Sequence, residues 1–430
     1  MRNLTENFRN RVWIAIKKTN TLLISETQLI RRHGWLSGRS LAFKCIKGLL
    51  ALFLVILVRL IRPLLWIRFG VLFSDRIGHF VTDIEFYLCE RELGLHPIKA
   101  IDVFSYSGDV CNTQLKIMCE RTLNVIGFTR YMEKINRFLP GGGDHAFHIL
   151  AGRPYGSRDI EGFLIRTNVH IKFTPEEIRQ GFCALEKMGV TPGSQFICFH
   201  ARDSVYLKMV YPDQDCSYHD YRDCSINNYI PAVEEMSRRG TFSIRMGAVV
   251  KESLKTKNPM IIDYPRLKRT EFLDIFLSAY CRFFVGSGSG IDSVASVFRR
   301  PIAYTNIIPL ELAPSQGPQD LFIPKKLWLT RERRFLRFRE IFQLANGTQY
   351  LRKETYARLG IEVVENSSNE IEALTREMDD RLLGKWRNTE EDEELQKRFW
   401  SLFPLPSRYH GAFQSRIGSQ FLLKNRHLLD

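Results

Sequence analysis

The stretch from Phe283 to Tyr304 constrains the fold of this chain more than any other. It begins with the apolar run Phe283–Val285, continues through a Gly/Ser segment at residues 286–290, and then carries apolar residues at helical spacing. Glycine and serine allow a sharp turn, and a helix that starts directly after the turn offers backbone N–H groups to an anion. The order predicts strand, turn, helix and second strand. The turn is either a phosphate-binding loop or an ordinary connection from strand to helix.

The same rhythm runs through most of the chain. Short apolar runs alternate with amphipathic stretches over residues 67–138 and again over residues 175–304. At the first of these, residues 67–73 predict a strand, residues 75–79 a glycine turn and residues 81–93 a helix. Such alternation is typical of parallel sheets covered by helices. A chain of 430 residues is long enough for two substantial cores, so we expect two α/β domains.

Polar residues follow three of the predicted strands. His200, Arg202 and Asp203 come after the strand that ends at Phe199, and Arg245 comes after the strand that ends at Ile244. The Gly/Ser segment follows the third strand. Ligands of open α/β sheets bind at the carboxyl ends of strands, so both arginines and the backbone of this segment are expected to converge on one anion-binding patch. The alternative is that each arginine forms an ordinary surface ion pair.

The charge of the chain indicates anionic partners. The formal net charge is +15, and the first 47 residues carry ten Lys or Arg against two acidic residues. This balance suits phosphorylated ligands, nucleic acid or an anionic membrane surface. The apolar run Gly48–Val58 is interrupted by Arg59 and Arg62, and it is shorter than the about 20 residues that span a bilayer. We expect this segment to lie in an anionic membrane interface, and a spanning anchor and a core helix are the alternatives.

Two further patterns bear on metals and nucleic acids. The nine cysteines form no CxxC pair and no Cys/His cluster at zinc spacing, which favours a reducing compartment and no structural metal. Asp213 and Asp215 form an Asp-x-Asp pattern that either binds a metal or belongs to a solvated loop, and we expect no metal. Residues 325–342 predict a basic amphipathic helix. Its aromatic residues keep the spacing of a packed face, so we expect no nucleic-acid partner.

Several motifs resemble known glycosyltransferases. FFVGSGSGIDSVASVFRRPIAY resembles the donor-binding strand, loop and helix of GT-B enzymes of the heptosyltransferase type, and FSDRIGHFVTDIE resembles the first glycine loop and helix of their acceptor-side domain. FHARDS is similar to the His-x-Arg-x-Asp run of protein O-fucosyltransferase-like enzymes. The combination, together with NNYIPAVEEMSRRGTFSIRMG, is similar to a group of bacterial glycosyltransferases assigned to surface-polysaccharide synthesis. The resemblance covers roughly residues 66–385.

The resemblance implies an α/β fold of the GT-B type, in which two Rossmann-like domains with parallel sheets face a central cleft. It implies four segments: a basic and amphipathic membrane-associating segment (1–65), an acceptor-side domain (66–190), a nucleotide-sugar donor-binding domain (191–365), and C-terminal helices that brace the first domain (366–430).

The resemblance also assigns roles to individual residues. It implies a donor site for the nucleotide-sugar diphosphate made of Arg202, Arg245, Ser287, Gly288, Ser289, Gly290, Asp292 and Ser293. Of these, Arg245 is a helper, and Asp292 or Ser293 supports the loop or touches sugar or ribose. Gly78, His200 and Asp203 are expected at the same cleft.

The general base is less well defined by the resemblance. Heptosyltransferases carry an acidic residue just after the glycine of the first loop, whereas His79 stands there in this chain, with Asp83 one helical turn later. His79 has a near-neutral intrinsic pKa, and Asp83 can orient it from position i+4. Both residues are therefore expected as the catalytic pair, and a histidine that only caps a helix is the alternative.

These expectations combine into one function. We expect a glycosyltransferase on the cytoplasmic face of the inner membrane, peripheral or monotopic, that moves a sugar from a nucleotide-sugar donor to a lipid-linked or surface-polysaccharide acceptor. Its partners are the donor, a glycan or glycolipid acceptor and an anionic membrane surface, with no cofactor beyond the nucleotide-sugar co-substrate. The alternative is a non-catalytic module that binds nucleotide sugars or phosphoglycans in a membrane-bound assembly complex.

Overall fold

A computed structural model describes residues 35–147, 158–210, 212–213, 215–314, 317–345, 352–403 and 415–430, and the side chains from residue 43 onward. Residues 1–34 of the expected membrane segment (1–65) therefore lie outside the described residues. The chain divides into two compact units. One comprises residues 1–72, 96–107 and 123–149, and the other comprises residues 73–95, 108–122 and 150–430. The domain boundaries expected from the sequence fall elsewhere, and they stay a prediction.

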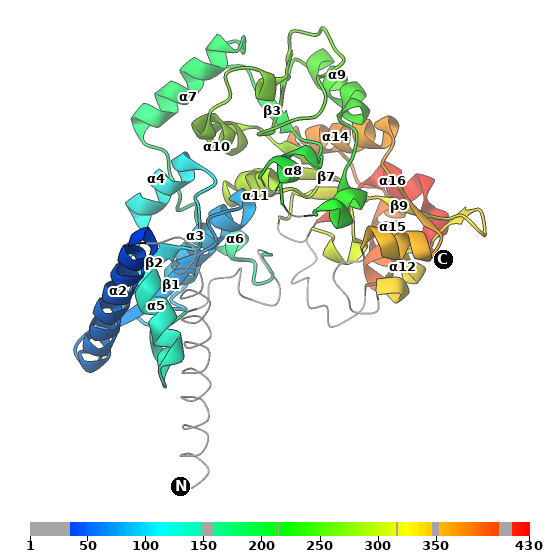
Figure 1. Cartoon of the computed structure of the whole chain (residues 1–430). Helices are drawn as coiled ribbons and strands as arrows, with labels where there is room; N and C mark the ends of the chain where they lie inside the picture. The colour runs from blue at the N-terminus through cyan, green and yellow to red at the C-terminus, as the bar shows by residue number, and fades with distance from the viewer. Residues whose placement is uncertain are drawn as a thin grey trace. The chain divides into compact units, whose positions relative to one another are not determined.

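The larger unit is built on a seven-stranded sheet in which every pair of neighbouring strands is parallel (Figure 1). The strands occur in the order β12-β8-β7-β6-β3-β4-β5. Their bounds are β3 Phe196–Phe199, β4 Phe242–Arg245, β5 Ile261–Ile262, β6 Phe284–Gly286, β7 Ile302–Ile307, β8 Leu321–Pro324 and β12 Arg416–Ile417. The strands β3 to β8 are buried along their whole length, which is why apolar residues dominate them in the sequence, with polar exceptions such as Arg245 and Asn306. The large parallel sheet confirms the α/β expectation.

Helices of the same unit surround this sheet. They are α3 Ile77–Glu92, α4 Thr113–Thr122, α6 Phe163–Arg166, α7 Pro175–Lys187, α8 Val205–Val210, α9 Ile230–Arg238, α10 Glu271–Tyr280, α11 Gly290–Val297, α12 Phe338–Ala345, α13 Lys353–Arg358, α14 Ser368–Leu382, α15 Glu390–Ser401 and α16 Ser419–Lys424. Several start at side-chain caps that the sequence encodes locally, such as the capping boxes of Thr174 with Glu177 and of Ser367 with Glu370. The late helix α14 packs against α9, β7 and β8, so the C-terminal region is part of this unit.

Two local predictions are wrong. Gly78 and His79 were expected in a turn, but α3 already begins at Ile77, directly after the extended Arg76. Residues 325–342 were expected as one helix, but they form β9 (Lys326–Leu329), β10 (Arg334–Phe335) and the start of α12. The strand β9 lies between β10 and β11 (Ile361–Val364) in an antiparallel sheet, and Trp328 pairs across it with Phe335. Cross-strand aromatic pairing thus outweighs the helical spacing of the sequence.

The smaller unit contains α2 (Trp35–Leu60), β1 (Trp66–Leu72), β2 (Ala100–Tyr106) and α5 (Thr129–Phe138). The parallel strands β1 and β2 are extended only by single bridges at Ala146 and Val125. The described sheet is therefore smaller than the Rossmann-like domain expected there. Figure 1 shows α2 and α5 side by side next to these strands. Among the described helices, none combines the length and the apolar character needed to cross a bilayer.

Candidate functional site

Three neighbouring strands of the large sheet deliver the residues expected to bind the donor. Because β6, β3 and β4 are adjacent and parallel, their carboxyl ends open at one edge of the sheet. The loops after β3 and β6 touch directly, since the backbone N–H of Arg202 donates to Ser287 Oγ at 2.9 Å. His200 contacts the same loop through Ser289. The structure thus brings the Arg202 and GSGSG loops together at one place.

The GSGSG loop has a shape that glycine makes possible. Gly288 adopts φ = +71°, in the left-handed region that L-residues rarely enter. At Gly286, an added Cβ would lie 2.6 Å from Asp292 Cγ. Ser289 and Asp292 close a capping box at the start of α11, in which Ser289 N–H donates to Asp292 Oδ2 (2.8 Å) and Ser289 Oγ to Asp292 Oδ1 (2.9 Å). Asp292 therefore shapes the loop, and burial raises its pKa to about 6 against the effect of these hydrogen bonds.

His200 is held in one tautomer by this capping box. Ser289 Oγ has a single proton and donates it to Asp292, so it accepts from His200 Nδ1 at 3.1 Å. Burial lowers the pKa of His200 to about 3, with the charges of Arg245 and Arg202 acting in the same direction. The ring is therefore neutral at pH 7, and its Nε2 is a hydrogen-bond acceptor.

Arg202 and Arg222 supply two neighbouring guanidinium groups near the GSGSG loop, and that of Arg222 contacts the loop directly. Arg202 pairs with Asp223 and donates to the carbonyl of His219 (3.3 Å), and its side chain is only 10% exposed. Arg222 donates to the carbonyl of Gly288 at 2.6 Å. Burial lowers the pKa of Arg202, and the neighbouring Arg222 lowers it further. Arg222 thus brings a positive charge to the loop that leads into α11, an arrangement that suits a diphosphate, and Asp223 holds Arg202 beside it.

The positive field extends beyond these two residues. Burial lowers the pKa of His219 to about 4, and the positive charges of the surrounding arginines act in the same direction. The arginines that act on it are Arg222, Arg202, Arg76 and Arg352. Lys325, at the end of β8, supports the segment that carries Arg222 by donating to the carbonyls of Asp223 (2.5 Å) and Tyr221 (3.1 Å). Arg222, His219, Arg76 and Arg352 were not among the residues expected at the site, although the polar and aromatic run 218–222 between β3 and β4 was a signal.

Arg245 and Asp203 lie at the same edge but are engaged in holding loops. Arg245 is 2% exposed, pairs with Asp263 (3.1 Å) and donates to the carbonyl of Glu252 at 2.6 Å. Asp203 accepts from the backbone N–H groups of Val205 (3.1 Å) and Lys251 (3.2 Å). Both therefore position the loops that border the site.

The start of α3 meets the start of α11. An added Cβ at Gly78 would lie 2.9 Å from Gly290 Cα and 3.3 Å from Ser293 Oγ, so only glycine permits this approach. His79 follows directly, its ring in edge contact with Phe73 at 5.5 Å. Burial lowers the pKa of His79, Arg76 lowers it further and Asp75 opposes them. A neutral imidazole can accept a proton.

Asp83 has a different position. It is fully buried, and its Oδ2 accepts from the backbone N–H of Phe73 at 2.9 Å. This bond ties the residue that follows β1 to α3. The geometry therefore favours a structural function for Asp83, and His79 is the better placed of the two expected catalytic residues.

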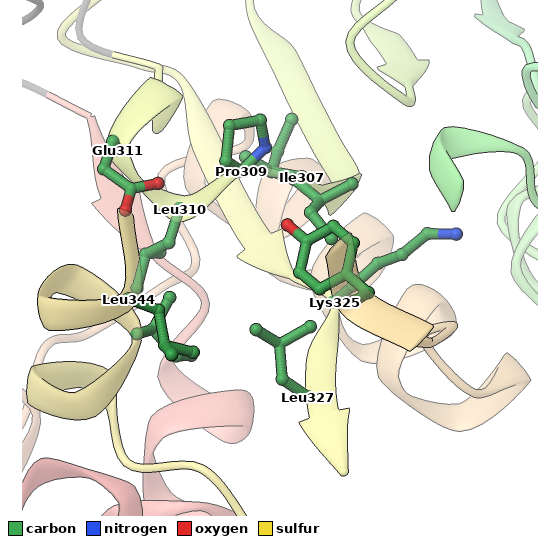
Figure 2. A pocket seen from close by; sticks show the side chains of 10 residues that line it. Ile307, Pro309, Leu310, Glu311, Lys325, Leu327 and Leu344 are labelled. Carbon is green, nitrogen blue, oxygen red and sulfur yellow. The ribbon is translucent and has the colours of Figure 1, made fainter. Parts of the chain in front are cut away.

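A small pocket borders the GSGSG loop at the ends of β7 and β8 (Figure 2). An added Cβ at Gly288 would lie 3.5 Å from Ile307 Cδ1, and Ile307 lines the pocket. Figure 2 shows Glu311 beside Leu310 and Leu344, while the Lys325 amine points away from Glu311. The space is about 20 Å³, enough for about one water molecule. Burial raises the pKa of Glu311 to about 7.

Metal-ligating side chains gather at one other place in the described residues. Glu85, Cys89 and His170 lie close together, but Arg299 donates to Glu85 at 2.8 Å and Thr167 Oγ1 to Cys89 at 3.0 Å. These hydrogen bonds make it an ion-paired cluster of the fold. Asp213 and Asp215 belong to no such group among the described residues, and Asp215 accepts from the N–H of Ser217 at 2.9 Å.

Comparisons with known proteins give similarity at the level of structure. No family model and no curated protein matches the chain. Among solved structures, it is similar to a glycosyl transferase of family 9 from Veillonella parvula (13% identity, TM-score 0.44, 75% of this chain and 99% of that one). It is also similar to the Escherichia coli ADP-heptose LPS heptosyltransferase II (13% identity, TM-score 0.37, 60% and 90%) and to the E. coli heptosyltransferase WaaC with ADP (8% identity, TM-score 0.32, 60% and 90%).

Proposed function

We propose that this protein is a glycosyltransferase that moves a sugar from a nucleotide-sugar donor to a lipid-linked or surface-polysaccharide acceptor. The observation that carries the proposal is the contact between the Arg202 loop and the GSGSG loop, with Arg222 bound to Gly288. Guanidinium groups and helix N–H groups are what a departing diphosphate requires. Similarity to glycosyltransferases supports the fold and the resemblance, and the chemistry rests on the site.

In the proposed reaction, the acceptor hydroxyl oxygen forms a bond to the anomeric carbon and the bond from that carbon to the diphosphate breaks. The diphosphate leaves with the negative charge, which Arg202 and Arg222 stabilise. The hydroxyl proton passes to His79, whose lowered pKa keeps the imidazole neutral before the reaction. His200 keeps its Nε2 available as an acceptor for a donor hydroxyl. We propose the cytoplasmic face of the inner membrane as the location, in line with the unpaired cysteines.

Calorimetry with a panel of nucleoside diphosphates tests the anion site. Arg202→Ala should weaken binding about tenfold or more, because a bidentate partner of the diphosphate is lost. Arg238→Ala is the matched control, since Arg238 lies 64% exposed on α9 and pairs only with a surface glutamate in the described structure. Unaltered affinity in Arg202→Ala would remove the assignment.

The ion pair between Arg202 and Asp223 requires a second variant. Arg202→Ala leaves the Asp223 carboxylate without its guanidinium partner, so a loss of binding could reflect misfolding. Arg202→Met combined with Asp223→Asn removes both charges, and it should fold and still bind weakly. A second assay measures the release of nucleoside diphosphate from nucleotide sugars in the presence of an acceptor. An enzyme releases the diphosphate, whereas the alternative, a non-catalytic binding module, would bind the donor without turnover.

A further inference from the structure

The helix α2 exposes a continuous apolar face. Its members recur at helical spacing and are each 43–72% exposed: Phe43, Ile46, Leu49, Leu50, Phe53, Ile56, Leu57 and Leu60. No charged residue interrupts this outer face between Leu49 and Leu57. Contiguous apolar patches on soluble proteins usually mark an interaction site. The proposed sugar-transfer chemistry makes no use of this face.

The opposite face of α2 fixes the helix in the smaller unit. Ala51, Val55 and Val58 are buried in a cluster with Phe69 of β1 and Met132 of α5. The apolar residues therefore divide into an inner set that forms a core and an outer set that does not. The outer face is a permanent part of the folded unit.

Polar contacts at the end of the helix add to this attachment. The Arg59 guanidinium donates to Asn136 Oδ1 (2.7 Å) and to the carbonyl of Pro140 (2.6 Å). Arg62 pairs with Asp144 at 2.7 Å. A helix that is packed on one side and bonded at its end cannot cross a bilayer alone, because its inner face and Arg59 would have to leave their partners.

The charges of α2 identify the partner. From Trp35 to Trp66 the chain has five basic residues and no acidic residue. Lys44 and Lys47 lie at one end of the outer face, and Arg59 and Arg62 follow the other end. The Lys47 ammonium lies over the Phe43 ring, 4.2 Å from its centroid, and 5.5 Å from the ring centroid of Tyr131, so this cation stays near the end of the outer face. Basic residues flanking a wide apolar face are typical of helices that bind anionic lipid surfaces.

A second copy of the chain fits this face less well. Two α2 helices packed through their outer faces would bring basic ends against basic ends, in either orientation, with no acidic residue in the helix to compensate. Anionic lipid headgroups supply the missing negative charge. We infer that α2 lies in the plane of an anionic lipid surface, with its outer face inserted among the acyl chains and its inner face bound to the protein.

Flotation of the full-length protein with vesicles tests this inference. Vesicles of phosphatidylglycerol and phosphatidylcholine should carry the wild type upward in a density gradient, and vesicles of phosphatidylcholine alone should carry less of it. Leu49→Glu, Phe53→Glu and Leu60→Glu combined should reduce the floated fraction about tenfold or more. A wild type that stays at the bottom of the gradient would overturn the inference.

A charge-matched control separates the face from the added charge. Ile117→Glu, Leu267→Glu and Leu383→Glu replace three exposed apolar residues of the larger unit, and this triple variant should float like the wild type. Equal flotation of both triple variants would contradict the proposal. Circular dichroism verifies that both are folded. Light scattering tests whether a second copy of the chain covers the outer face instead. This would be the case if the wild type is a dimer, the outer-face variant is a monomer and neither binds vesicles.

Discussion

Gly78 and Gly290 lie against each other through their backbones, so that the first turns of α3 and α11 meet at the point where the GSGSG loop ends. An added Cβ at Gly78 would stand 2.9 Å from Gly290 Cα, and one at Gly290 would stand 3.2 Å from the Gly78 nitrogen. His79 follows Gly78 directly in the first turn of α3. The close approach of the two backbones explains why a glycine stands in each motif.

Gly78→Ala should destabilise the protein, because the new methyl group meets backbone that cannot move aside. The expected loss is about 1–3 kcal/mol in the free energy of unfolding, measured by urea denaturation. Gly108→Ala is the control, since an added Cβ there meets nothing within 4 Å and the glycine has no positive φ. Equal stability of the two variants would show that the helices can separate without cost.

Substitution of His79 should affect the reaction rate, whereas substitution of Asp83 should affect stability. His79→Ala should lower kcat about 10²–10⁴-fold while leaving donor affinity and Tm almost unchanged. Asp83→Ala should lower stability by about 1–3 kcal/mol, because the Phe73 N–H then lacks its acceptor. The double variant should show both effects. If the His79→Ala variant turns over as fast as the wild type, His79 is not the general base.

The acid limb of the rate profile provides a second test of His79. A general base acts only when it is deprotonated, so activity falls as pH drops through its pKa. Burial and Arg76 lower the pKa of His79, and the fall is therefore expected on the acid side of an ordinary histidine. Arg76→Ala should move this limb toward higher pH in a plot of kcat/KM against pH. An unchanged limb would mean that another group sets it.

Arg222→Ala should weaken diphosphate binding about tenfold, since one cationic group and the 2.6 Å bond to the Gly288 carbonyl are lost together. The remaining affinity should depend less on salt, because fewer charges face the ligand. Calorimetry at two salt concentrations measures both effects, with Arg238→Ala as the control. A change in Tm without a change in affinity would make Arg222 purely structural.

Glu311→Gln should change the pH dependence of stability. No hydrogen bond from another described residue reaches the Glu311 carboxylate, and burial raises its pKa from 4.5 to about 7 in the folded state. Because the folded state binds the proton more tightly, ionisation of Glu311 costs stability as pH rises through this range. The variant should therefore be more stable than the wild type at pH 8, by up to about 3 kcal/mol, and similar at low pH.

The control for this titration is Glu362→Gln, which replaces an exposed glutamate on β11. Its stability should follow the wild type at every pH in urea denaturation. If Glu311→Gln also follows the wild type at pH 8, the Glu311 carboxylate is better solvated than its position indicates.

The central part of the site was predictable because it is encoded locally. The run from Phe283 to Tyr304 contains an apolar strand, a small-residue turn, a capping pair and an apolar helix face within one short stretch, so each step follows from the neighbouring residues. The position of Arg202 beside this turn followed from the general rule that ligands bind where parallel strands end.

Other residues could not be assigned in this way. Arg222 reaches the Gly288 carbonyl only through the fold of the segment between β3 and β4, and Arg245 is occupied by Asp263, which follows a different strand. Asp83 looked like a catalytic carboxylate in the sequence, yet its burial and its bond to Phe73 are tertiary facts. The strands β9 and β10 replaced a predicted helix because they pair with each other, and because β11, further along the chain, pairs with the other edge of β9.

The sequence by itself determined the repeating α/β pattern, the anion-binding turn and the apolar, basic character of α2, since these depend on residue type and spacing along the chain. Only the tertiary structure decided which charged groups face a ligand and which are used up by one another, and which side of α2 is buried. Ion pairing and burial depend on atoms that are distant in sequence, so spacing alone cannot predict them.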